Sequence, residues 1–143
     1  MNIEKTTLPS NLLKFHHIGV ATSSVENASK FYLEMGYSKS ETFNDPIQKV
    51  NICFMQKNDM PQIELIEPAS DDSPITKTLQ KNNGAGTTYH ICYKVNNINE
   101  AIALLKKSGF LPLSKPVNAV AMEESIICFL FNRYHGLIEL VEK

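Results

Sequence analysis

Two histidines and two glutamates recur at matching places in a duplicated sequence. The segment HHIGVA around His17 and the segment YHICYKV around His90 lie 73 positions apart. Farther along, the triplet IEL recurs at an offset of 75 positions, with a glutamate at the centre of each copy. Imidazole nitrogens and carboxylate oxygens are ligands of divalent cations such as Ni, Co, Zn and Mn. The duplication therefore predicts a symmetric metal site with four candidate ligands: His17, Glu64, His90 and Glu139.

The strand faces support this prediction, because side chains alternate across a β-strand. His17 shares its face with Gly19, and His90 shares its face with Cys92, whereas bulky apolar residues such as Ile18 and Val20 lie opposite. We expect the apolar face to pack on helices. The histidines then point to the other side of the sheet, beside small residues that leave room for a ligand.

The two candidate glutamates lie among apolar neighbours, Glu64 beside Ile66 and Glu139 beside Val141. A carboxylate in such surroundings is costly unless it is paired or bound to a cation. Four other polar residues are left out of the predicted site: Glu67 and Glu142, which we expect to face solvent, and His16 and His135, which have no histidine at the equivalent position of the other copy.

The elements that position these residues follow the same duplication. Apolar periodicity and turn residues predict, in each copy, a strand, a helix and three further strands. The first copy has strands at 15–21, 37–42, 48–56 and 61–67 and a helix from Ser23 or Ser24 to Gly36. The second has strands at 88–95, 110–113, 124–131 and 136–142, a helix from Asn96 or Asn97 to Gly109, and a longer loop at 117–123. The fold class is thus α+β, with two tandem βαβββ modules at residues 15–68 and 88–143.

The remaining segments are a tail at residues 1–14 and a linker at 69–87. Ser73 before Pro74 predicts the start of one short helix in the linker, which Asn83-Gly84 ends.

The bulk composition excludes several classes of function. The formal net charge is −1 and Arg133 is the one arginine, so no basic surface suggests nucleic acid or an anionic membrane as partner. The longest apolar run has about six residues, far short of the ~20 that cross a bilayer. No targeting segment is visible, and the three cysteines form no CxxC pair. We expect a cytoplasmic protein whose cysteines are reduced and buried.

The chain resembles the vicinal oxygen chelate (glyoxalase/bleomycin resistance/dioxygenase) superfamily over residues 15–143. The segments that carry the resemblance are HHIGVA with its helix, IELIEP followed by DSPITKTLQ, YHICYKVNNINEAI, and the ending GLIELVEK. IELIEP with SPI resembles methylmalonyl-CoA epimerases, and YHICYKV with the ending resembles clostridial-type glyoxalase I. The resemblance implies an eight-stranded, partly open barrel and a homodimer.

By this resemblance, His17, Glu64, His90 and Glu139 fall on the four metal-ligand positions, and Glu139 or Glu64 is the base. The implied enzyme is a glyoxalase I-like (lactoylglutathione lyase) isomerase that abstracts a proton α to a carbonyl through a metal-stabilised enediolate. One divalent ion is the cofactor, and glutathione or a CoA thioester is part of the small-molecule substrate.

Two alternatives stay open. The first is a methylmalonyl-CoA epimerase. Such epimerases can carry Gln where this chain has Glu64, they have a double histidine where it has Tyr89-His90, and some have a further glutamate on the strand that holds Asn51 to Cys53. The second is a metal-free, bleomycin-resistance-like binding protein, which the four ligand-type residues disfavour. The second glutamate also disfavours a dioxygenase.

Overall fold

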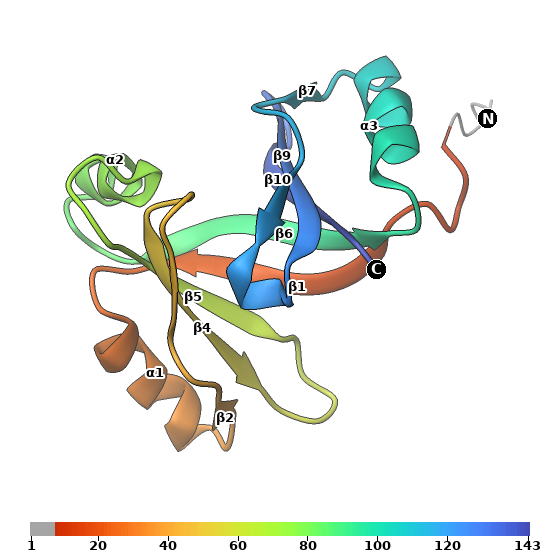
Figure 1. The fold of residues 1–143 in the computed structure, drawn as a ribbon. Helices are drawn as coiled ribbons and strands as arrows, with labels where there is room; N and C mark the ends of the chain where they lie inside the picture. Colours follow the sequence, from red (N-terminus) through yellow and green to blue (C-terminus); the bar gives the residue numbers. More distant parts are fainter. Residues whose placement is uncertain (1–7) are drawn as a thin grey trace, which may run out of the picture.

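The computed structural model describes residues 8–143, so most of the predicted tail, residues 1–7, lies outside the described residues. Within residues 8–143 the chain forms three α-helices and ten β-strands (Figure 1). None of these helices is long and apolar enough to span a membrane.

The first module contains one helix and five strands: β1 (Lys14–Ala21), α1 (Val25–Glu34), β2 (Ser38–Lys39), β3 (Phe43–Asp45), β4 (Val50–Gln56) and β5 (Ile63–Pro68). The linker helix follows as α2 (Pro74–Lys81). The second module repeats the order with β6 (Thr87–Val95), α3 (Ile98–Lys107), β7 (Leu111–Pro112), β8 (Val117–Ala119), a 3-10 turn (Val120–Met122), β9 (Ser125–Asn132) and β10 (Gly136–Glu142).

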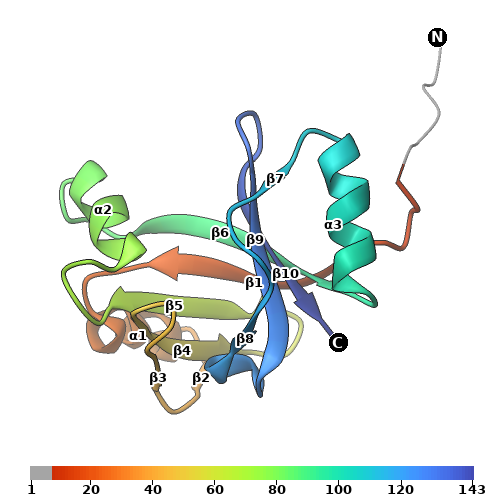
Figure 2. The same ribbon diagram turned by 45° about the horizontal axis from the view of Figure 1, so that its top comes forward.

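All ten strands belong to one open sheet. Eight of them follow the order β2-β4-β5-β1-β6-β10-β9-β7, while β3 pairs with β4 and β8 pairs with β9. The two modules join where β1 and β6 pair in antiparallel fashion, side by side across the middle of the molecule (Figure 2). On either side, β5 runs parallel to β1 and β10 runs parallel to β6. The four strands that carry the candidate ligands are therefore the four central strands.

The predicted α+β class and the paired βαβββ modules are confirmed, and the two additional strands are short. The predicted loop at 117–123 contains β8 and the 3-10 turn, and the predicted strand at 37–42 is reduced to β2. Its neighbour β3 lies between the predicted strands at 37–42 and 48–56 and pairs separately with β4. These edge segments are two or three residues long, too short to show an alternating pattern.

Helices α1 and α3 pack on one side of the sheet, whereas the candidate site and α2 lie on the other side. Ile18 and Val20 pack with a cluster that includes Val25 of α1, and Tyr93 packs with a cluster that includes Ile98 of α3. Figure 1 shows α1 beside the β4–β5 half and α3 beside the β9–β10 half. Cys92, from the face of His90, belongs to a third cluster on the other side of the sheet. The predicted assignment of strand faces is confirmed.

Both helices begin at the same kind of cap. Ser24 accepts a hydrogen bond from the Asn27 backbone N–H, and Asn97 accepts one from the Glu100 backbone N–H. Each helix then ends before a glycine in the left-handed region, at Gly36 with φ +89° and Gly109 with φ +91°. This is the conformation that glycine adopts without steric cost.

The prediction that Glu67 and Glu142 face solvent is wrong. Glu67 Oε1 accepts a hydrogen bond of 2.7 Å from the backbone N–H of Val25, the first residue of α1. Glu142 Oε2 accepts one of 2.9 Å from Ile98, the first residue of α3. These carboxylates satisfy free N–H groups and place negative charge at the positive ends of the helix dipoles. They tie the last strand of each module to that module's helix.

Replacing Glu142 by alanine should therefore destabilise the fold by about 1–2 kcal/mol, because the Ile98 N–H loses its acceptor and α3 loses a favourable charge. Urea unfolding of E142A should show a lower midpoint with an unchanged slope. The matched control is E41A at an exposed position. Equal midpoints for E142A and E41A would contradict a capping role.

Candidate metal centre

The structure brings the four candidate ligands together at the junction of the modules. They come from neighbouring strands in the order Glu64 on β5, His17 on β1, His90 on β6 and Glu139 on β10. The register is repeated in the two halves. Gly19 pairs with both Glu64 and His90, and Cys92, its repeat equivalent, pairs with both His17 and Glu139. Long-range strand pairing thus creates a cluster that lies within one chain.

The four donor atoms have the spacing that one bound ion requires. His17 Nε2 lies 3.2 Å from His90 Nε2, 3.4 Å from Glu64 Oε1 and 3.2 Å from Glu139 Oε1. His90 Nε2 lies 3.4 Å from Glu64 Oε1 and 3.1 Å from Glu139 Oε1. With metal–donor bonds of about 2.1 Å, donors at right angles are about 3.0 Å apart and tetrahedral donors about 3.4 Å apart. The observed separations fall in this range.

Burial makes the cluster costly without a cation. His17 is 0 % exposed and each of the other three residues is 2 % exposed. Burial alone disfavours the ionised form of Glu139, but the neighbouring imidazoles of His17 and His90 outweigh this effect and lower its pKa to about 2. Burial likewise opposes protonation of His17, but the charge of Glu64 and contacts to both carboxylates raise its pKa to about 9. Without an ion, a proton on His17 is the positive charge that balances the carboxylates.

The residues fit a divalent metal ion. Glu139 Oε1 is fully buried, and no donor among residues 8–143 makes a hydrogen bond to it. Two imidazoles and two carboxylates form a borderline donor set, suited to Ni, Co, Zn or Mn. A cation between the four atoms would give Glu139 Oε1 its missing partner. The role of His17, Glu64, His90 and Glu139 as ligands nevertheless stays a prediction, which metal analysis can test.

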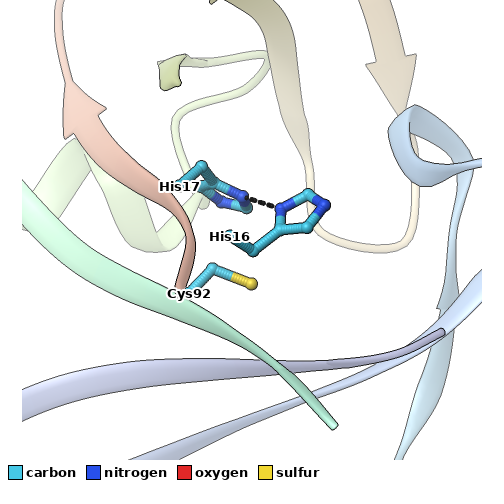
Figure 3. Close-up of side chains that lie close together, drawn as sticks. All are labelled: His16, His17 and Cys92. Atoms are coloured by element: carbon cyan, nitrogen blue, oxygen red, sulfur yellow. Dashed lines mark hydrogen bonds between the residues drawn. The ribbon is translucent and has the colours of Figure 1, made fainter. Parts of the chain in front are cut away.

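Two residues beside the cluster were missed by the sequence analysis. His16 Nδ1 lies 2.7 Å from His17 Nδ1, and the two rings point toward one another with the Cys92 sulfur beside them (Figure 3). His16 was left out because its repeat equivalent is Tyr89, and Cys92 because it is a small residue in an apolar stretch. Burial strongly raises the pKa of the Cys92 thiol, so this sulfur stays protonated. Burial and the neighbouring His17 lower the pKa of His16 to about 4, so its ring is neutral at pH 7.

Gly19 makes room for His90. A Cβ atom built on Gly19 would overlap the imidazole of His90 from the neighbouring strand. On its other sides the His90 ring meets the ring of Phe129 edge to face, with centroids 5.3 Å apart, and that of Tyr89, with centroids 5.4 Å apart. The histidine is thus confined by packing, and the absence of a side chain at residue 19 is a requirement of this site.

A cavity of about 480 Å³ opens beside the cluster, and Glu64 is the one candidate ligand that lines it. Its walls are mainly apolar, with Ile52, Ile127 and Phe129 among the lining residues. At the rim, Lys49 forms an ion pair with Asp72. A small molecule can therefore reach the cluster from the side of Glu64, whereas Glu139 is buried and does not line the cavity.

The paired modules and the buried His/Glu cluster are the features of a candidate metalloprotein, and comparison with known sequences identifies its family. The sequence profile of the Glyoxalase/Bleomycin resistance protein/Dioxygenase superfamily matches residues 16–129. The chain belongs to this superfamily. The resemblance drawn from the sequence motifs is confirmed.

Its relatives include several epimerases. The human mitochondrial methylmalonyl-CoA epimerase is 37% identical over 133 residues, which cover 91% of this chain and 74% of the human protein. An ethylmalonyl-CoA/methylmalonyl-CoA epimerase of Cereibacter sphaeroides is 29% identical, with 89% and 96% covered. The structure of a methylmalonyl-CoA epimerase in complex with methylmalonyl-CoA and NH4+ superimposes with a TM-score of 0.80 at 27% identity, with 93% and 96% covered. These relatives confirm the prediction of an epimerase-like isomerase and favour that alternative over the glyoxalase I-like reading.

Ion binding should depend on pH, because an ion on His17 Nε2 must displace a proton. In the metal-free protein the pKa of His17 is about 9, so ion affinity should rise up to tenfold per pH unit between about pH 6.5 and 9, with about one proton released per ion. Titration calorimetry with Zn²⁺ in two buffers of different ionisation enthalpy measures the number of protons released. The stability of the metal-free protein has the opposite trend, because protonated His17 stabilises the fold. This contribution is fully present below pH 6.5, the pKa of histidine in the unfolded chain, and is lost as the pH rises through about 9. An affinity that stays flat from pH 6.5 to 8.5 would contradict ligation by His17.

Substituting Gly19 by alanine should disturb the cluster without touching a ligand. The added methyl group overlaps the His90 ring, which Phe129 and Tyr89 confine, so we expect ion affinity to fall at least about tenfold and stability to fall by about 1–3 kcal/mol. Gly86→Ala is the control, since its Cβ would meet only the Ala21 carbonyl oxygen at 3.2 Å. Wild-type ion affinity in G19A would show that His90 Nε2 is not needed in its observed place.

Proposed function

We propose that this protein is a metal-dependent epimerase that removes and returns the proton on C2 of an acyl-CoA thioester, with methylmalonyl-CoA as the first substrate to test. The observation that carries the proposal is the convergence of Glu64 and Glu139, from opposite modules, on the same two imidazoles beside an apolar pocket that Glu64 lines. The similarity to epimerases over about nine tenths of the chain supports it.

Inversion at carbon needs a proton taken from one face and a proton given to the other. Among the residues that line the pocket, the carboxylates are Glu64 and Asp72, and Asp72 is paired with Lys49 at the rim. Glu64 is therefore the base that faces the substrate. Glu139 lies across the cluster from Glu64 and is the second group for the proton exchange. In this scheme one carboxylate accepts the C2 proton, and the other, in its protonated form, donates a proton to the opposite face.

The cluster and pocket also supply electrostatic stabilisation. A divalent ion held by His17, His90 and the two glutamates would act as a Lewis acid for the negative charge that develops on the substrate oxygens. The apolar walls, with Ile52, Ile127 and Phe129, exclude water and lower the local dielectric constant. Both effects make the C2 proton easier to remove.

Glyoxalase I-like activity is the second candidate. It is favoured by the carboxylate at residue 64, where the epimerases that the sequence resembles can carry glutamine. The same pair of carboxylates would move a proton between adjacent carbons of a hemithioacetal.

A homodimer and a cytoplasmic location remain predictions from the resemblance, and the cluster itself needs residues of one chain only.

The test is deuterium incorporation at C2 of (2R)- and (2S)-methylmalonyl-CoA in D2O, measured by NMR with ion-loaded protein. Wild type should exchange and interconvert both epimers. Glu64→Gln should lower the rate about 10²–10⁴-fold for at least one epimer, because glutamine can still donate an oxygen to the ion but cannot accept the proton. Glu139→Gln should lower the rate for the opposite epimer, and Glu41→Gln, at an exposed position, should match wild type.

The possible results separate the candidates. Full activity in Glu64→Gln with none in Glu139→Gln would leave Glu139 as the single base. An ion-loaded wild type that converts a glutathione hemithioacetal but exchanges neither epimer would establish the glyoxalase reading. A wild type that binds no ion and catalyses neither reaction would refute the enzyme and favour a ligand-binding protein.

A further inference from the structure

The two imidazoles of the cluster are equivalent by the sequence repeat but differ in their contacts. His17 and His90 both direct Nε2 toward the glutamates, so each directs Nδ1 away from them. His17 Nδ1 lies 2.7 Å from His16 Nδ1. His90 Nδ1 is buried, and no group among residues 8–143 makes a hydrogen bond to it. The two repeat-related histidines can therefore be compared directly: Nδ1 of His17 has a polar partner, and Nδ1 of His90 has none among residues 8–143.

A β-bulge brings the partner into place. Phe15 pairs with Tyr93 and His17 pairs with Cys92, so His16 is an extra residue with no pair on β6. In a regular strand the side chains of residues 16 and 17 would point to opposite faces of the sheet. A bulge re-aims one of them. The rings of His16 and His17 consequently approach edge to face, with centroids 5.0 Å apart (Figure 3).

The second module has a bulge at the equivalent position. Gly19 pairs with His90 and Val20 pairs with Thr88, so Tyr89 is the extra residue. Tyr89 meets the His90 ring edge to face and lines the substrate pocket instead of offering a nitrogen. Both modules therefore have the bulge, but only in the first module does the bulged residue, His16, make a hydrogen bond to the candidate ligand histidine.

The direction of this hydrogen bond follows from what Nε2 must do. A neutral imidazole carries one proton, so a His17 that offers the Nε2 lone pair to a cation carries the proton on Nδ1. His16 Nδ1 must then be the acceptor. We propose that His16 is a positioning residue that accepts this hydrogen bond and thereby fixes the tautomer and ring orientation in which His17 faces the two glutamates. Partners of this kind contribute to metal affinity by orienting the ligand.

A different role for the same atoms is a second metal site formed by His16, His17 and Cys92, whose donor atoms lie within 4.8 Å of one another. That site would need a lone pair on His17 Nδ1, the nitrogen that carries the proton when Nε2 binds the ion. The two roles exclude one another, and the Nε2 position between two carboxylates favours the positioning role.

Zinc affinity of three variants, measured by competition with a chromophoric chelator, tests the proposal. His16→Leu removes the acceptor and should weaken zinc binding about 10–100-fold. His16→Asn should stay within about threefold of wild type, because its Oδ1 is as many bonds from Cβ as the histidine Nδ1 and can accept the same hydrogen bond. His135→Leu, at an exposed histidine, should equal wild type. Since the readout is zinc affinity, the result does not depend on whether the protein is an epimerase.

A direct readout uses ¹⁵N-labelled wild-type protein loaded with Zn²⁺. We expect a scalar coupling across the hydrogen bond between His17 Nδ1 and His16 Nδ1, with the proton on His17. The proposal is overturned if His17 carries its proton on Nε2, if wild type binds no zinc, if a folded His16→Leu binds zinc as tightly as wild type, or if His16→Asn is as weak as His16→Leu. Should His16→Leu fail to fold, the wild-type coupling and the His16→Asn affinity decide the question.

Discussion

The structure depends on the burial of two carboxylates and two imidazoles where the modules join. Like charges that lie this close without water repel strongly, and an uncompensated buried charge costs several kcal/mol. Glu64 and Glu139 are tolerated because His17 and His90 lie between them at 3.1–3.4 Å. Each module supplies one carboxylate and one imidazole, so neither module alone contains the balanced set. The antiparallel pairing of β1 with β6 is the interaction that assembles it.

The rest of the sheet keeps those four side chains in place. The central strands are held on one face by the clusters that pack on α1 and α3, which leaves the opposite face for the site. Glu67 and Glu142 lie near the ends of the strands that carry Glu64 and Glu139, and they bind the first N–H groups of α1 and α3. The same strand therefore presents one carboxylate to the site and another to a helix. Each helix N-terminus is thus linked to a strand whose candidate ligand lies three residues before the capping glutamate.

Much of this arrangement could be predicted because it is periodic. The repeat offset identified His17, Glu64, His90 and Glu139, and strand alternation assigned their faces. What could not be predicted rests on local breaks in regular pairing or on distant partners. His16 reaches His17 only because a bulge interrupts the alternation, and Glu142 caps a residue 44 positions away. Gly19 was expected to leave room on its own strand, but the space it provides is occupied by His90 from the next strand.

The two halves of the cluster are related by the sequence repeat but differ in the residues that surround them. On the first side, Glu64 and Tyr89 border a pocket whose wall includes Ile75 of α2, a helix that occurs once, in the linker between the repeats. On the second side, Glu139 is buried and lines no part of the pocket, and its strand partner Cys92 lies beside His16. The predicted ion site is thus open on the flank of Glu64 and buried on the flank of Glu139. In the proposed reaction a substrate would approach the ion and Glu64 from the open flank. Because Glu139 does not line the pocket, an exchange that uses both carboxylates requires the substrate carbon to lie directly against the four donor atoms, where Glu139 can reach it.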